Sequence, residues 1–129
     1  MKLFDNVMTA CVGSFGAEQV QLIAENQIEL AILDNEGQPM FPVYIGFHSE
    51  HDLEISAILF QVPEADAKAF MAQCNNMNTQ YPCVKFYLDS GYLCAGMDLL
   101  LYTGDAQDVM SMLMALLQVV ASNLPGLLG

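Results

Sequence analysis

The sequence predicts an α+β fold in which a mostly antiparallel five-stranded sheet is combined with three helices, in the order α-βββ-α-ββ-α. Two patterns predict it. Apolar and polar residues alternate in five stretches, as in strands, and three other stretches place apolar residues three and four apart, as in helices. No repeat or low-complexity linker interrupts them, so we expect residues 1–129 to form a single domain.

The first third of the chain should contain a helix and a hairpin. Residues 3–12 have helical apolar spacing, whereas residues 17–26 fit a strand or a helix, with a slight preference for a strand that is not counted among the five. Residues 27–33 and 41–47 alternate as strands, and the polar residues 34–37 between them favour a turn. These two strands are expected to pair as a hairpin.

The middle of the chain should contain a central strand and a second helix. Residues 53–62 become apolar on both faces, which is typical of a strand inside a sheet. Pro63 and the acids after it favour a helix start, because acidic side chains interact well with the positive end of the helix dipole. The expected buried stripe of this helix consists of Ala67, Phe70, Met71 and Cys74.

The last third should contain another hairpin and a long helix. Alternating residues 84–88 and 93–99 flank the turn pair Ser90-Gly91. Asp105 is placed to cap the final helix, in which apolar residues from 109 to 120 lie on almost every side. Such a helix needs partners on more than one side, so we expect it to pack on the sheet and on another subunit or protein.

The charge balance excludes two classes of partner. The formal net charge is -12, and the only basic residues besides two histidines are Lys2, Lys68 and Lys85. Nucleic acids and anionic membranes are recognised largely through Lys and Arg, so neither is an expected partner. The start of the chain lacks the apolar core of a signal peptide, which predicts a cytoplasmic location. Four cysteines without metal-binding spacing are expected to be small core thiols.

One loop brings imidazole and carboxylate groups together. His48, Glu50, His51 and Asp52 could hold a metal or act as acid and base, but the same residue types are common in solvated turns. No Gly-x-Ser-x-Gly motif or phosphate-binding loop is present. We therefore predict no catalytic residues, no metal site and no cofactor.

The segment from Phe70 to Leu101 resembles the YbjN family of bacterial proteins. The resemblance lies in a helix that ends in Asn75-Asn76-Met77-Asn78, then Val84-Lys85-Phe86-Tyr87-Leu88-Asp89, Gly91 and Met97-Asp98-Leu99. That family shares its fold with type III secretion chaperones, which are small, acidic and dimeric. The resemblance implies a domain that holds an unfolded or extended segment of another protein through apolar patches.

The sequence predicts a protein that acts by binding another protein. We expect a non-enzymatic, chaperone-like or regulatory protein-binding domain that forms a homodimer, with nine methionines available to adapt to apolar surfaces. The alternatives are a subunit with one fixed partner, and a small metal-dependent or acid/base enzyme centred on the His48–His51 loop. Two sets of apolar residues are the expected contacts: Phe4, Val7, Met8 and Cys11 for a partner, and Met110, Leu113, Leu117 and Val120 for a second subunit or a partner.

Overall fold

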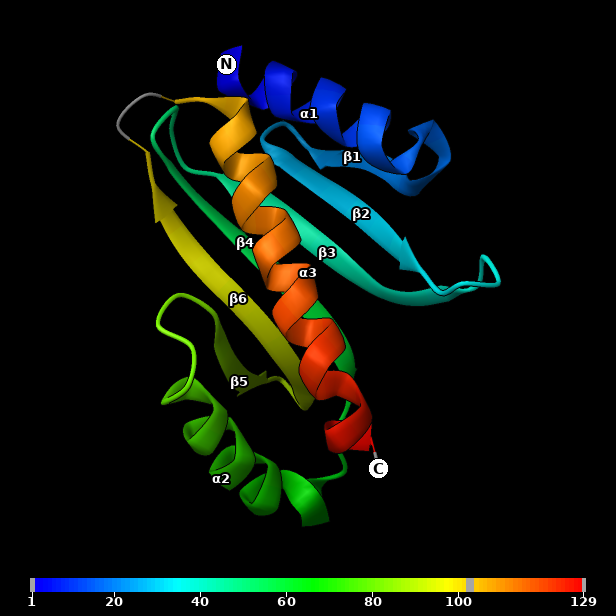
Figure 1. Ribbon diagram of the computed structural model, residues 1–129, viewed down its shortest axis with the longest axis vertical. Helices are drawn as coiled ribbons and strands as arrows, with labels where there is room; N and C mark the ends of the chain where they lie inside the picture. The colour runs from blue at the N-terminus through cyan, green and yellow to red at the C-terminus, as the bar shows by residue number, and fades with distance from the viewer. Residues whose placement is uncertain (1, 102–103, 129) are drawn as a thin grey trace.

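The computed structural model describes residues 2–101 and 104–128, which form six strands in one antiparallel sheet of order β1-β2-β3-β4-β6-β5 (Figure 1). The strands are β1 (Val20–Ala24), β2 (Gln27–Leu33), β3 (Pro39–Phe47), β4 (Asp52–Gln61), β5 (Lys85–Asp89) and β6 (Tyr92–Leu100). The helices are α1 (Lys2–Phe15), α2 (Ala67–Asn78) and α3 (Ala106–Leu128), with the 3-10 turns η1 (Ala17–Gln19) and η2 (Glu64–Asp66). The predicted α+β class is confirmed.

The number of strands differs from the prediction, because the sheet has six strands and not five. The additional strand is β1, which comes from the ambiguous residues 17–26 and makes the order α-ββββ-α-ββ-α. β1 is an edge strand that pairs with β2. Leu22 and Ile23 are 52% and 41% exposed, so apolar residues are exposed on both of its faces. An edge strand of this kind lacks the clean alternation that marks a half-buried strand.

Both predicted hairpins are present, and their turns have a clear chemical cause. In the first, the Asp34 carboxylate accepts hydrogen bonds from the backbone N–H groups of Glu36 and Gln38, at 2.8 and 2.9 Å. In the second, Ser90 and Gly91 have φ values of 53° and 85°. Two consecutive residues in the left-handed region give a tight turn whose twist matches that of the paired strands.

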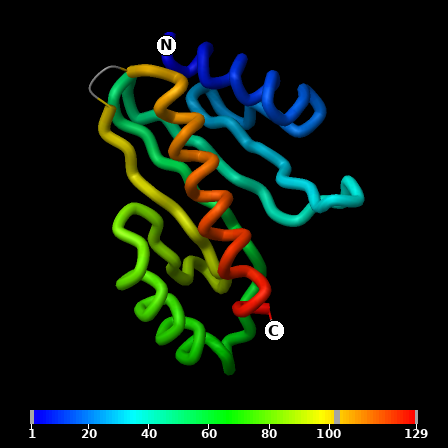
Figure 2. Tube along the Cα trace, in the orientation of Figure 1, coloured from blue at the N-terminus to red at the C-terminus, as the bar shows by residue number. Residues whose placement is uncertain are grey.

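One face of the sheet carries the core, and we call it the covered face. α1 and α3 both lie on the near side of the sheet in Figures 1 and 2, and α3 runs diagonally across it. The strand register aligns one row of buried side chains on this face, namely Val43, Ala57, Ala95 and Phe86. Because side chains alternate along a strand, the next row points to the opposite, open face, and it consists of Tyr44, Ser56, Gly96 and Lys85.

α2 flanks β5 at one end of the sheet, and its packing corrects one expectation. The ring of Phe70 meets the ring of Phe60 edge-to-face, with 5.7 Å between centroids. Cys74 and Met77 are buried, but Met71 is 55% exposed and does not belong to the predicted buried stripe. The stripe follows spacings of four and three residues from Phe70, which places Met71 on the outer side of the helix.

Local chemistry determines where α1 ends and where α3 begins. α1 extends past residue 12, where the predicted helical spacing ended, and stops before Gly16, whose φ of 92° is incompatible with a helix. At the start of α3 the Asp105 carboxylate accepts a hydrogen bond from the backbone N–H of Gln107, at 2.9 Å. This confirms Asp105 as the predicted cap.

Candidate protein-binding surface

α1 packs against the first half of α3, although the two helices stand at opposite ends of the sequence (Figure 2). Val7 and Cys11 are fully buried, and the Cys11 sulfur lies 3.8 Å from the Met110 sulfur. The start of α1 is fixed separately, because the Glu50 carboxylate accepts a hydrogen bond from the backbone N–H of Leu3 at 3.1 Å. An acceptor at this position satisfies one of the free amides of the helix N-terminus.

The eight residues predicted to contact a partner or a second subunit divide into two groups. Five of them are buried, namely Val7, Cys11, Met110, Leu113 and Val120. The other three are partly buried and pack against the core, namely Phe4, Met8 and Leu117. The buried five are core residues in this structure, so the surface that these helices offer to a partner comes mainly from their other positions.

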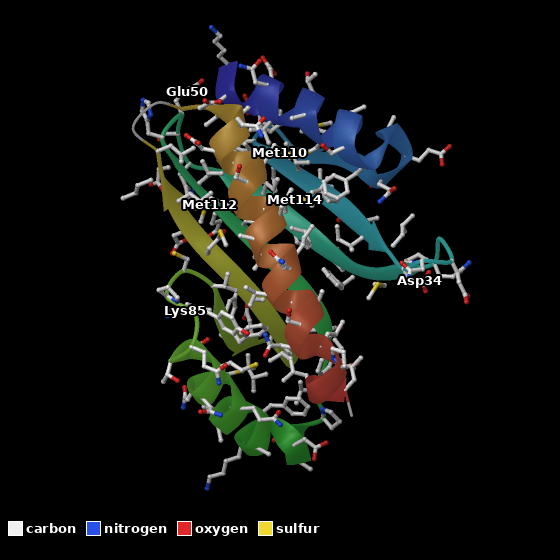
Figure 3. All side chains as sticks on the ribbon, viewed as in Figure 1. Asp34, Glu50, Lys85, Met110, Met112 and Met114 are labelled. Carbon is white, nitrogen blue, oxygen red and sulfur yellow. The ribbon has the colours of Figure 1, made fainter. Side chains whose placement is uncertain are left out.

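A groove of about 670 Å³ lies where α1 and α3 meet, and we call it the α1–α3 groove. It is lined by Ala10, Gly13, Ser14 and Phe15 from α1, and by Gln107, Met110, Ser111, Met114, Ala115 and Gln118 from α3. Figure 3 shows Met110 and Met114 on the flank of α3 toward α1, with Met112 on the opposite flank.

Small side chains help to create this groove, because half of its lining residues are Gly, Ala or Ser. A Cβ atom added at Gly13 would have no heavy atom within 4 Å, so the space above it is open. Met114 lies at the other wall and is 53% exposed. A flexible thioether beside an open hollow suits an apolar side chain of varied shape.

The outer surface of α3 beyond Asp108 is exposed but carries no charge. The chain contains fifteen Asp and Glu residues, yet none of them, and no Lys or Arg, occurs from Val109 to Leu128. Only 22% of the most apolar 18-residue stretch of this helix is buried. By length and composition alone α3 could cross a membrane, a property that core helices of soluble proteins share. Its uncharged outer side continues the α1–α3 groove into a larger neutral surface.

The His48–Asp52 loop uses two of its four candidate side chains for structure. Glu50 caps α1, and the Nδ1 atom of His51 lies 2.7 Å from the carbonyl oxygen of Leu101. In the part of the chain that the structure describes, no group of three or more His, Cys, Asp or Glu residues is placed to hold a metal ion.

Three of the four cysteines are buried as expected, but Cys83 is exposed. Burial raises the pKa of the Cys11 thiol to about 11, and burial with the nearby Asp89 and Cys74 raises that of Cys94 to about 11. Burial raises the pKa of Cys74 as well. A thiol with a raised pKa stays protonated at neutral pH and is a poor nucleophile, so these three are structural.

Of the residues that line the groove, only Met110 was among the predicted contacts. Gly13 and Ala10 carry no apolar signal, and Met114 was visible only as one of several methionines in the last helix. A run of small residues on one side of a helix is the signal that could have indicated a hollow.

The chain matches a known protein family over most of its length. Residues 15–128 match the YbjN family, described as "Putative bacterial sensory transduction regulator", and this match leaves out most of α1. No curated protein sequence matches the chain.

Three solved structures resemble this one at low sequence identity. The HopA1-SchA chaperone-effector complex matches with a TM-score of 0.62 and 13% identity over 93% of this chain and 91% of that one. The Yersinia pestis type III secretion chaperone SycH, in complex with a stable fragment of YscM2, gives 0.57 and 13% over 92% and 98%. The ExsC-ExsE complex gives 0.60 and 16% over 88% and 85%. These similarities establish a type III secretion chaperone-like fold.

Proposed function

We propose that this chain, which belongs to the YbjN family, is a non-enzymatic protein-binding domain that holds an apolar or extended segment of a partner protein. In this proposal residues 1–129 act as one chaperone-like or regulatory domain in the bacterial cytoplasm. The partner segment lies in the α1–α3 groove and on the neutral outer side of α3.

The observation that carries the proposal is the contrast between α3 and the rest of the molecule. A surface helix of a strongly acidic protein would be expected to carry charges on its exposed side, since charge keeps such a surface soluble. α3 instead exposes Met114 at 53% and Leu128 at 65%, with no charged residue after Asp108. Exposed apolar surface beside a groove is typical of sites that bind other proteins.

The structural relatives support a protein partner. Each of the three was solved as a complex, one described as a chaperone with an effector and one as a secretion chaperone with a fragment of another protein. Since one fold serves many functions, the relatives support the class of ligand and do not identify the partner.

The same neutral surface also suits a second copy of the chain, and we include a homodimer in the proposal. Exposed residues of α3 such as Ser111, Met114 and Ala121 are small or flexible, which allows two helices to approach closely. Light scattering at several protein concentrations tests this part. If the protein is a monomer at every concentration, the homodimer is excluded from the proposal, and the groove is left as a site for a partner protein alone.

The test of the proposal compares variants that fill the groove with one that does not. Gly13→Gln places a polar side chain into the open space above α1, and Met114→Lys puts a charge at the opposite wall. Met71→Lys is the matched control, since Met71 is also a helical methionine and is 55% exposed, but lies on α2 and not on α1 or α3. Circular dichroism should show that all three remain folded.

The readout is affinity capture from the native host with quantitative mass spectrometry. We expect the wild type and Met71→Lys to retain the same partner or partners, and Gly13→Gln and Met114→Lys to lose them. One stoichiometric protein would indicate a fixed or regulatory partner, and many substoichiometric ones would indicate chaperone clients. Equal capture by all four proteins would contradict the proposed site.

A further inference from the structure

A second groove follows a strand edge on the other side of α3. β6 is longer than β5, and the last paired residues are Lys85 and Gly96. Beyond this point β6 continues from Met97 to Leu100, paired with β4 on one side. Within residues 2–101 and 104–128 no strand pairs on its other side. An unpaired stretch of strand presents backbone amide and carbonyl groups that another strand can use.

The groove along this edge has a volume of about 1130 Å³. One wall is formed by α3, through Asp108 and Met112, and Figure 3 shows Met112 on the flank of α3 away from Met110 and Met114. The opposite rim consists of open-face residues, including Tyr87 and Leu100. Leu100 is 79% exposed, which leaves a large apolar side chain in solvent at the mouth of the groove.

Two carboxylates stand directly opposite each other at this rim. Glu54 of β4 and Asp98 of β6 are cross-strand partners and line the groove, as do Asp89 and Asp108. Like charges in directly opposite positions destabilise a sheet. The lysine in this groove, Lys85, donates hydrogen bonds at 3.3 and 3.2 Å to two backbone carbonyls at the end of α2 and in the next loop, so it is occupied elsewhere.

An aromatic ring lies beside these carboxylates. A Cβ atom on Gly96 would come within 3.3 Å of the Tyr87 hydroxyl and 3.1 Å of the Ile55 carbonyl oxygen, so the glycine makes room for the ring to lie across β6. The pKa of Tyr87 is raised, by burial first and then by Cys94, Asp89, Glu54 and Asp98. Carboxylates next to a tyrosine ring bind guanidinium and ammonium groups through charge and cation–π attraction.

We propose that the edge of β6 from Met97 to Leu100 is a second docking site, which takes an extended segment of a partner protein with arginine at alternate positions. Because side chains alternate along a strand, the arginines would face Glu54 and Asp98 while the residues between them face α3 and Met112. The inference rests on the proposed function only in taking the ligand to be a polypeptide. It concerns a surface separate from the α1–α3 groove.

The test uses the full chain labelled with ¹⁵N and the capped peptide Val-Arg-Val-Arg-Val. We expect saturable shifts of the backbone amides of Met97 to Leu100 and of the neighbouring residues of β5. The same peptide with citrulline in place of arginine keeps the shape but not the charge, and should bind about tenfold more weakly, which corresponds to about 1.4 kcal/mol. A peptide that is N-methylated at every residue, which cannot donate backbone hydrogen bonds to β6, should bind weakly too.

Matched variants distinguish binding at Glu54 and Asp98 from non-specific attraction of the peptide to an acidic protein. Glu54→Gln with Asp98→Asn should weaken arginine-peptide binding about tenfold, whereas Glu25→Gln with Glu36→Gln, two exposed turn residues with the same charge change, should alter it less than twofold. Relieving the like-charge pair should leave the fold at least as stable. Gly96→Ala, which crowds Tyr87, should also weaken binding.

Several results would overturn the inference. These are absence of binding, equal binding of the arginine and citrulline peptides, or shifts confined to the α1–α3 groove. Shifts of Met97 to Leu100 that depend on protein concentration without peptide would instead assign this edge to a second copy of the chain. The proposed function stands or falls separately, because its groove variants, Gly13→Gln and Met114→Lys, lie outside this surface and should leave peptide binding unchanged.

Discussion

The two faces of the sheet differ in what they leave exposed, although the same strands supply both. On the covered face, Ile45, Ile55 and Ala95 are completely buried beneath the helices. On the open face, Glu54 and Asp98 stand side by side in solvent. Adjacent residues of a strand thus have different roles, because one contributes to the buried core and the next to the exposed surface. Substitutions at two neighbouring positions should therefore affect different properties of the protein.

The helices that cover the sheet show a similar division. The inner side of α3 is core, with Leu113 and Leu116 fully buried, whereas its outer side beyond Asp108 is exposed and uncharged. The strongly apolar positions that the sequence pattern singles out in α3 are therefore mostly buried in the core. A partner would contact the exposed residues that lie between these buried positions.

The largest expected effect comes from neighbouring substitutions on the two faces. Ile55→Ala removes a fully buried side chain and should lower the free energy of unfolding by about 2–5 kcal/mol. Glu54→Ala, one residue earlier on the open face, should change it by less than about 0.5 kcal/mol. Urea unfolding followed by circular dichroism measures both. Similar losses for the two variants would mean that the open face is also part of the core.

A smaller effect is expected where α2 is fastened to the sheet. The Asn78 side chain donates to the Phe86 carbonyl oxygen at 2.9 Å and accepts from the Phe86 N–H at 2.7 Å. Asn78→Ala should cost about 1–3 kcal/mol of unfolding free energy, because both partly buried backbone groups lose their partner. Asn76→Ala, at an exposed position on the same helix, is the control and should cost much less.

Gly13→Ala is expected to stabilise the protein slightly. Gly13 lies inside α1, and an added Cβ would meet no atom within 4 Å. Replacing an unstrained helical glycine by alanine should raise the unfolding free energy by about 0.5–1 kcal/mol. A thermal melt gives the direction. A lower melting temperature would show that the space above α1 is filled, contrary to the groove described here.

The thiols provide a test that involves little change in stability. Cys94 points to the open face but is only 4% exposed, whereas Cys83 is accessible. A thiol reagent at neutral pH should therefore modify one cysteine per folded chain rapidly and the other three only on unfolding, and Cys83→Ser should abolish the rapid phase. Rapid modification of two thiols in the wild type would show that the open face around Cys94 is looser than described.

Much of the fold could be predicted from the sequence, because most strands have one buried face and both hairpins have residues that favour their turns. β1 was not among the five predicted strands, because an edge strand with exposed Leu22 and Ile23 shows no one-sided alternation. Met71 was assigned to the buried side because apolar character does not tell which of two adjacent positions faces the core.

The candidate sites could not be predicted in the same way. The α1–α3 groove depends on the contact between Cys11 and Met110, which are 99 residues apart, and on small residues that carry no hydrophobic signal. The second groove depends on the extension of β6 beyond the end of β5, and on the register that places Glu54 of β4 opposite Asp98 of β6. Periodicity describes one element at a time, whereas both grooves arise between elements.

The most direct test of the central claim is photo-crosslinking in the native host. A benzophenone amino acid replaces Met114 in the α1–α3 groove in one variant, and Glu36 in the distant first hairpin turn in the other. We predict a defined crosslinked partner, or a crosslinked second copy, from position 114 and none from position 36. No adduct at position 114, or the same adducts at both positions, would contradict a protein-binding role for this groove.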